Sequence, residues 1–205
     1  ADYLAVEYPV EGVELKKAGI KTPIMVLTAG TDFFNEIIDY GLEPGIPNLS
    51  SLKVLCKVLK ERGVTDFPIH IKLDTGMHRL GFMTEEIPSL TEFLSGCHEV
   101  KVKSVYSHLA AADDPENDGF TIGQAELFVR NADMVSATLG YRPLYHLLNS
   151  AGIERFPQYQ FDMVRLGIGI YGVSAIPGNR LSPVASFKCK VLQIKTLKPG
   201  DGTIG

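Results

Sequence analysis

The sequence has no tryptophan and only three cysteines, Cys56, Cys97 and Cys189, among its 205 residues. Their wide spacing and odd number fit neither a zinc motif nor a disulfide framework, so we expect no metal site and a reducing cytoplasm. The chain also lacks an apolar run close to the roughly 20 residues that span a bilayer, and no signal peptide pattern is visible. These absences argue against a membrane protein and against a disulfide-stabilised secreted one.

Neither sign of charge dominates the chain. Twenty lysine and arginine residues face 24 aspartate and glutamate residues, which gives a net charge of -4. A nucleic-acid-binding protein usually carries a basic surface, so we expect no nucleic-acid partner. Hydrophobic residues make up 45% of the chain and charged residues 21%, which is typical of a soluble globular domain.

Strand-like and helix-like segments alternate along the chain, and this order predicts a parallel α/β sheet. A closed (β/α)8 TIM-type barrel needs eight units, and about seven are visible. An open doubly wound sheet is the alternative, but its glycine-rich phosphate turn after the first strand is missing. The expected strands are Tyr3–Glu7, Pro23–Thr28, Leu42–Pro47 (weak by composition), Phe67–Asp74, Val100–His108, Leu144–Asn149 and Met163–Tyr171.

The pattern changes after Tyr171. Ile176–Pro183 reads as a linker, and Val184–Leu197 alternates without an intervening helix, as at the start of an antiparallel β domain. We therefore expect a barrel domain over residues 1–175 and a linker with the beginning of a C-terminal β domain over 176–205. Because the first residue is Ala1 and not Met, we expect the barrel to be truncated at its N-terminus.

The stretch Ile69–Gly81, IHIKLDTGMHRLG, is the first candidate for a functional site. Its period-2 pattern stops at a turn signal, Asp74–Thr75–Gly76. In a parallel α/β protein the carboxyl ends of strands build the site. The strand therefore delivers Lys72 and Arg79 to that region, where an arginine can hold a carboxylate or phosphate through two hydrogen bonds.

Three other strand ends carry polar residues. Taken singly, each has a structural explanation, but barrel sites draw residues from several strands. An arginine inside an apolar run also needs an acceptor. The histidines His70, His98 and His146 are interpreted as structural, with His70 directed outward or toward a helix. The candidates at these strand ends are Ser107 with His108, Asn149 with Ser150, and Arg165 with Gly167 and Gly169.

Four motifs in order resemble the alanine racemase family, the fold-type III pyridoxal-phosphate (PLP) enzymes. The resemblance extends over nearly the whole chain, because the opening residues also look like the second and third βα units of that barrel. The motifs are KLDTGMHRLGF (Lys72–Phe82), SHLAAAD (Ser107–Asp113), LLNSAG (Leu147–Gly152) and FDMVRLGIGIYG (Phe161–Gly172).

The resemblance implies a role for each candidate. Arg79 would bind the substrate carboxylate, and Lys72 would position it, as a carbamate in some members of the family. The implied cofactor-binding residues are His108 against the cofactor ring, Asn149 lining the site, Ser150, Gly167 and Ile168 at the phosphate, and Arg165 at the pyridine nitrogen.

The resemblance also implies an isomerase that interconverts L-alanine and D-alanine for peptidoglycan synthesis in a bacterial cytoplasm. A homodimer with a shared active site is implied too. The family's Schiff-base lysine and catalytic tyrosine fall outside these 205 residues, so we expect this piece alone to be inactive. Three alternatives stay open: a racemase for serine or a broader set of amino acids, a non-catalytic PLP-binding barrel, and a racemase module fused to another cell-wall enzyme.

Overall fold

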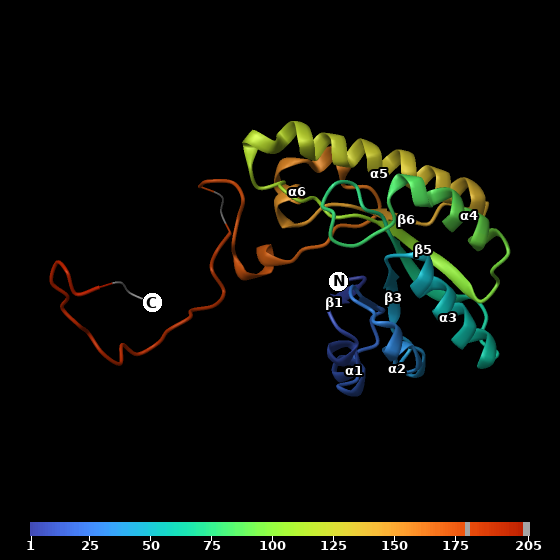
Figure 1. The fold of residues 1–205 in the computed structure, drawn as a ribbon, viewed down its shortest axis with the longest axis horizontal. Helices are drawn as coiled ribbons and strands as arrows, with labels where there is room; N and C mark the ends of the chain where they lie inside the picture. Colours follow the sequence, from blue (N-terminus) through green and yellow to red (C-terminus); the bar gives the residue numbers. More distant parts are fainter. Residues whose placement is uncertain (179–180, 203–205) are drawn as a thin grey trace.

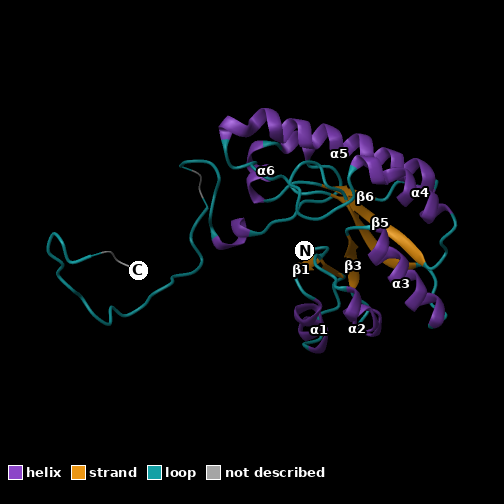
Figure 2. Ribbon diagram, in the orientation of Figure 1, coloured by secondary structure: helices purple, strands orange, loops and turns teal. Residues whose placement is uncertain are grey.

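A computed structural model describes residues 1–178 and 181–202. Its core is one sheet of six strands in sequential order, with every neighbouring pair parallel. The sheet curls as part of a barrel (Figure 2). The prediction of an incomplete TIM-type barrel is therefore confirmed. The strands are β1 (Leu4–Val6), β2 (Ile24–Val26), β3 (Glu43–Ile46), β4 (Phe67–Lys72), β5 (Val100–Tyr106) and β6 (Leu144–His146).

Helices follow the strands and lie along the outside of the curled sheet (Figure 1). The buried stripe of α3 is typical: Leu52, Leu55 and Leu59 recur at helical spacing and are fully buried against the sheet. Each such side chain stabilises the fold by about 1.5–3 kcal/mol. The helices are α1 (Pro9–Lys17), α2 (Phe34–Asp39), α3 (Leu49–Glu61), α4 (Ile87–Ser95), α5 (Asp118–Leu139) and α6 (Ser150–Arg155).

The seventh strand expected at Met163–Tyr171 does not form, so that prediction was wrong. Met163 makes only an isolated bridge to His146, and Ile168–Tyr171 is a 3-10 helix. Gly167 and Gly169 interrupt the apolar pattern, and glycine weakens a strand because it has no side chain to pack. At Gly172, with φ of +81°, an added Cβ would lie 2.2 Å from the Ser182 carbonyl oxygen, so the chain turns here instead of extending.

The C-terminal segment leaves the barrel as an extended trace (Figure 1). Described residues 181–202 contain no helix or strand, and Phe187 and Leu192 are at least 95% exposed. The antiparallel domain is therefore not formed by these residues, and the division at 175 stays a prediction. Residues 179–180 of the expected linker and 203–205 lie outside the described residues. No helix of the described chain is long and apolar enough to cross a bilayer.

Candidate functional site

A cavity of about 860 Å³ opens at the carboxyl ends of the strands. The ends of β4, β5 and β6 meet there with the segment that follows Met163, and strand ends are where parallel α/β folds build their sites. All eight binding and supporting residues that the sequence predicts line this one cavity: Lys72, Arg79, His108, Asn149, Ser150, Arg165, Gly167 and Ile168.

The loop after β4 has a defined shape because its own side chains hold it. The Asp74 carboxylate accepts hydrogen bonds from the backbone N–H groups of Gly76 (2.9 Å) and His78 (3.1 Å), which closes a turn typical of aspartate. Gly81 lies at φ of +129°, and a Cβ there would meet backbone atoms of Leu73 and Asp74 at 2.6 Å. The loop therefore folds back on β4 and carries Arg79 over the cavity.

The two cations on this side of the cavity differ in burial. Lys72 is 7% exposed, and its Nζ lies 5.8 Å from the centre of the Tyr106 ring. Burial lowers the pKa of the Lys72 amine, and the charges of Arg79 and Arg165 lower it further. Arg79 is exposed at the cavity mouth, and none of the ion pairs among the described residues includes it. Arg79 is therefore placed to receive an anion from solution.

Arg165 is held by neutral acceptors. Its two terminal nitrogens donate to the carbonyl oxygens of Ser107 (2.6 Å), Leu147 (3.1 Å) and His146 (3.2 Å). They also donate to Nδ1 of His146 (2.7 Å) and approach Nδ1 of His108 at 3.3 Å. Burial lowers the pKa of the guanidinium to about 10, which still leaves it charged at neutral pH. The acceptors for Arg165 thus lie at the ends of β5 and β6, and none of these acceptors is a carboxylate.

His108 is kept neutral by its surroundings. Burial lowers the pKa of its imidazole to about 4, and the positive charges of Arg165, Arg79 and Lys72 add to this effect. At neutral pH the His108 ring is therefore uncharged and lies beside Arg165. A neutral aromatic ring of this kind can pack against a planar ligand.

A line of hydrogen bonds runs from Arg165 down the barrel interior. Nε2 of His146 lies 2.7 Å from Oγ of Ser104, which lies 2.6 Å from Nδ1 of His70. Nε2 of His70 then lies 3.0 Å from Oε2 of Glu43. Because Arg165 donates to Nδ1 of His146, every proton can be assigned in one direction. The result is a relay with a cation at the upper end and a carboxylate at the lower end.

The interpretation of His70 as directed outward was wrong. Its side chain is fully buried inside the barrel, on the same face of β4 as Lys72, while Ile69 and Ile71 pack toward the helices. Burial favours a higher pKa for the Glu43 carboxyl, but the hydrogen bonds from His70 and Tyr3 and the nearby positive charge together outweigh it, and the pKa lies below its ordinary value. Glu43 therefore stays ionised and anchors the relay.

Sequence reasoning missed Tyr106. This residue follows Ser104 on the inward face of β5, and that period-2 position was the available signal. Its ring stacks on His146 with centres 5.0 Å apart and lies 5.4 Å from the Arg165 guanidinium carbon. Its buried hydroxyl has no hydrogen-bond partner among the described residues. Tyr106 thus forms part of the cavity floor between the two buried cations.

The opposite wall of the cavity is built by backbone N–H groups. Gly167 and Gly169 each donate to Oγ of Ser150 at 3.0 Å. A Cβ on Gly169 would lie 2.8 Å from the end of the Leu166 side chain and 3.3 Å from the Ser150 hydroxyl, so a larger residue here would displace Leu166 and crowd Ser150. Asn149 caps α6 by accepting from the N–H of Gly152 at 2.9 Å, which fixes Ser150 at the cavity edge. Convergent N–H groups of this kind suit an anion.

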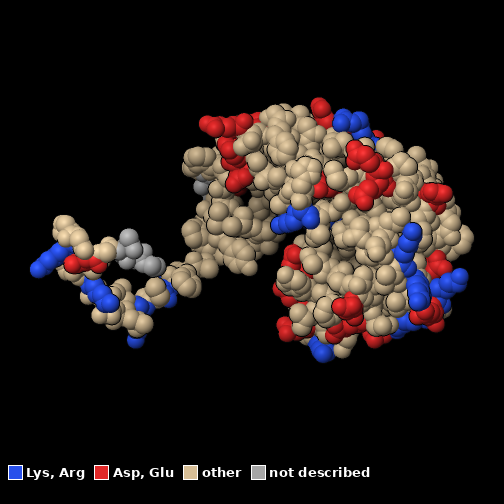
Figure 3. Space-filling model, in the orientation of Figure 1, with Lys and Arg blue, Asp and Glu red and all other residues tan. Residues whose placement is uncertain are grey.

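Charge elsewhere is mixed. Acidic and basic side chains are interspersed over the face shown in Figure 3, unlike the continuous basic surface of a nucleic-acid-binding protein. The fold and the cavity together define a class of protein: a β/α-barrel protein whose cavity is lined by an exposed arginine, a buried charged arginine and converging backbone N–H groups.

Comparison with known proteins narrows this class. The family model described as "Alanine racemase, N-terminal domain" matches residues 1–175. The alanine racemase of Synechocystis sp. is 35% identical over 98% of this chain and 55% of its own length. That of Cutibacterium acnes is 34% identical over 100% of this chain and 55% of its own length. The chain therefore belongs to the alanine racemase family.

Solved structures agree with this assignment. The alanine racemase of Clostridium difficile 630 has a TM-score of 0.79 with 28% identity, over 89% of this chain and 47% of that one. The enzyme from a D-cycloserine-producing Streptomyces lavendulae has a TM-score of 0.74 with 28% identity, over 86% and 47%. The chain spans about half the length of the curated relatives it matches.

Proposed function

We propose that this chain forms the cofactor- and substrate-binding half of a PLP-dependent alanine racemase, an isomerase that interconverts L-alanine and D-alanine. The observation that carries the proposal is the convergence on one cavity of eight motif residues, which come from the ends of β4, β5 and β6 and from the segment after Met163. Membership of the family and 35% identity to a curated alanine racemase support the same reading.

The residues present fit the phosphate of PLP. A phosphate is bound by several converging hydrogen-bond donors. The N–H groups of Gly167 and Gly169 converge on the Ser150 hydroxyl, so a phosphate at this wall would find two amides and one hydroxyl. Ile168 lies between the two glycines, and its own N–H completes the turn that we assign to the phosphate. Asn149 contributes by fixing the start of α6.

The other wall fits the cofactor ring. The neutral His108 imidazole offers a face against which a pyridine can pack. The terminal N–H groups of Arg165 are bound to acceptors of the protein, so its Nε–H would be the donor to a ring nitrogen. PLP, when bound, supplies an electron sink that makes the Cα hydrogen of an amino acid acidic. Because Arg165 keeps its own proton at neutral pH, it would donate a hydrogen bond to the nitrogen without protonating it. A cofactor held in this way would be a weaker electron sink, which would favour reprotonation at Cα over transamination.

Arg79 and Lys72 would serve the substrate. An exposed guanidinium at the cavity mouth can hold the carboxylate of alanine through two parallel hydrogen bonds. Lys72 lies deeper, and its positive charge repels that of Arg79 unless its amine is modified. A carbamate on Lys72 would replace a like charge with an opposite one and hold Arg79 in place. Lys72 is thus a positioning residue in this proposal.

An exposed apolar surface beside the cavity bears on the oligomeric state of the protein. Leu166, Ile168 and Tyr171 are each more than half exposed beside the cavity, and a contiguous apolar patch of this kind supports a covering partner. We infer a homodimer whose second copy closes the site, working in a bacterial cytoplasm in the supply of D-alanine for peptidoglycan. The two proton-transferring groups of the family, a lysine and a tyrosine, would come from outside these residues.

The test of the binding proposal compares two ligands that differ only in phosphate. The full chain is titrated with PLP and with pyridoxal, and binding is followed by ligand absorbance. We expect saturable binding of PLP, much weaker binding of pyridoxal, and loss of the difference in Ser150→Asp, which puts a carboxylate against the phosphate. Equal binding of both ligands by the unsubstituted chain would show that the glycine wall is not a phosphate site.

A further inference from the structure

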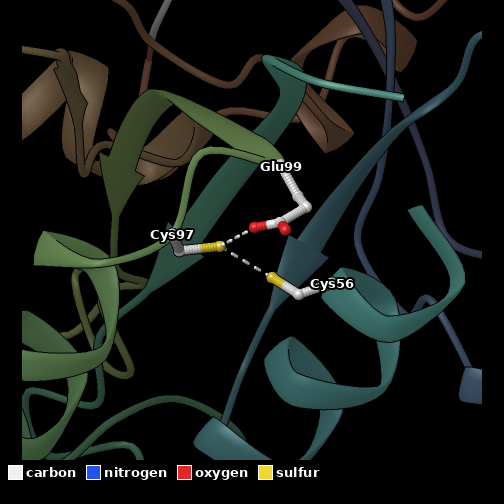
Figure 4. A group of neighbouring side chains, drawn as sticks. All are labelled: Cys56, Cys97 and Glu99. Atoms are coloured by element: carbon white, nitrogen blue, oxygen red, sulfur yellow. Dashed lines mark hydrogen bonds between the residues drawn. The ribbon is translucent and has the colours of Figure 1, made fainter. Parts of the chain in front are cut away.

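Two cysteines and a glutamate meet far from the cavity. Cys56 projects from α3, while Cys97 and Glu99 lie in the connection between α4 and β5, and the three side chains point toward one another (Figure 4). The Cys56 and Cys97 sulfurs are 3.0 Å apart, and the Cys97 sulfur is 3.2 Å from Oε2 of Glu99. All three atoms lie within 4.8 Å of one another. None of these residues lines the cavity described above.

The third residue decides what kind of site this is. Two close thiols alone could be packing or the precursor of a disulfide, because a thiol is only a weak hydrogen-bond donor and acceptor. A carboxylate does not stabilise a disulfide, because disulfide sulfurs carry neither a proton nor a positive charge. Two sulfurs and a carboxylate oxygen together form a donor set that a borderline-soft divalent cation prefers.

We propose that Cys56, Cys97 and Glu99 bind a Zn²⁺ ion that joins α3 to the α4–β5 connection. Zinc takes sulfur at about 2.3 Å and carboxylate oxygen at about 2.0–2.2 Å in a tetrahedral arrangement. Ligand atoms in such a site lie roughly 3.5–3.8 Å apart, so the two sulfurs need to separate by less than about 1 Å. Each thiol gives its proton to water on binding, and a water takes the fourth position.

The surroundings allow the ion to enter. Cys56 is 7% exposed, which protects its sulfur, while Cys97 is only half-buried. Cys97 also lines a second cavity of about 460 Å³, which reaches the surface beside His98. The positive charge of Lys60 acts on Glu99 and competes with the cation for it. The site therefore has one buried ligand, one ligand on an entry path and one surface ligand.

The experiment measures metal uptake by the full chain, reduced and freed of metal by a chelator. Zinc content is measured after equilibration, and Co²⁺ is used as a coloured substitute whose thiolate charge-transfer band counts sulfur ligands. We expect one ion per chain. Cys56→Ser and Cys97→Ser should each lose the site, whereas Cys189→Ser, which changes an exposed cysteine outside the cluster, should bind as the unsubstituted chain does.

Glu99→Gln separates a three-ligand site from a pair of thiols. It should keep the thiolate band but weaken zinc binding by at least roughly tenfold, the smallest loss typical when a supporting group of a metal site is removed. Should a cysteine variant misfold, protection of two of the three thiols from alkylation by Zn²⁺ in the unsubstituted chain gives the same answer. Two results would overturn the proposal: no uptake by the reduced chain, or uptake that Cys56→Ser and Cys97→Ser leave unchanged.

Discussion

Arg165 donates to Nδ1 of His146 at 2.7 Å, and this contact fixes the direction of the whole interior relay. Nδ1 of His146 must accept, so Nε2 must carry the proton and donate to Ser104. Burial and the charge of Arg165 hold the pKa of His146 well below its ordinary value, so the ring is neutral. Glu43, the one anion in the relay, lies at the end far from Arg165. Because the relay places no anion next to Arg165, the positive charge of this arginine acts on the cavity.

The relay predicts an unusual cost for a small substitution. Ser104→Ala removes the hydroxyl that links the two histidines and leaves one buried nitrogen of each without a partner. We expect the free energy of unfolding to fall by about 1–3 kcal/mol, measured by urea denaturation. Ser95→Ala, at an exposed serine, is the matched control and should cost within about 0.5 kcal/mol. Equal costs for the two variants would mean that the relay is not closed as assigned.

Arg79 is expected to act on substrate and not on cofactor. In the full-length protein that carries these residues, Arg79→Ala should lower kcat/KM for alanine by roughly 100-fold, because a hydrogen bond to a charged group contributes about 1.5–3 kcal/mol. Affinity for PLP, measured by absorbance titration, should stay unchanged. Arg79→Lys keeps a charge but not the paired donors, and should recover only part of the loss. A parallel loss of PLP affinity would contradict the assigned role.

Arg165 is expected to suppress a side reaction. Arg165→Glu replaces a donor with a group that can share a proton with the ring nitrogen, and so strengthens the electron sink. Pyruvate released from alanine, detected with a coupled dehydrogenase, should rise relative to racemisation. Arg165→Lys keeps a positive charge there and should leave pyruvate formation low. Unchanged pyruvate in Arg165→Glu would count against the contact between this arginine and the pyridine nitrogen.

His108 predicts a loss of stability in mild acid. Its pKa is about 4 in the folded chain and 6.5 ordinarily, so between these values the unfolded chain binds the extra proton and the folded chain does not. Unfolding therefore becomes easier as pH falls from about 6.5 toward 4, by up to about 3 kcal/mol. Urea denaturation of the cofactor-free chain across this range should show a shallower slope in His108→Gln. An unchanged slope would place the titration elsewhere.

Lys72 is expected to react with carbon dioxide. Its lowered pKa leaves more of the amine neutral, and the neutral amine adds CO₂ to form a carbamate with release of a proton. Incubation with ¹³C-bicarbonate should give a carbamate carbon signal that Lys72→Gln abolishes. Lys53→Gln, at an exposed lysine, should keep the signal. A signal that survives in Lys72→Gln would show that another amine is modified.

Much of the sheet was predictable from the sequence. Alternation of segments required a strand at Leu42–Pro47 although Pro44 and Gly45 disfavour one, and β3 does form there. The same reasoning failed at Met163–Tyr171, because counting apolar residues ignores that glycine there turns the backbone. Periodicity shows which residues of a segment share a face. It does not show whether the segment pairs with a neighbouring strand.

The cavity was predictable as a set of residues but not in its depth. The four motifs predicted eight residues that line this one cavity, because parallel strands deliver their carboxyl ends to one rim. The relay beneath was missed. The period-2 pattern places His70 and Ile71 on different faces of β4, but it does not show which face lines the barrel interior. Lys72 lies on the same face as His70, and this was the signal that the sequence offered. Cys56 and Cys97 are 41 residues apart, and only the packing of α3 brings them together.

We propose that this cavity binds the cofactor and substrate for alanine racemisation, and a measurement of optical activity tests this directly. L-alanine is incubated with the full-length protein that carries these residues and with PLP, and the circular dichroism of alanine is followed. We expect the signal to decay to zero as the two enantiomers become equal in amount, and to decay far more slowly for Arg79→Ala. A protein that retains PLP and leaves L-alanine unchanged would contradict it and would identify a barrel that binds the cofactor without racemising alanine.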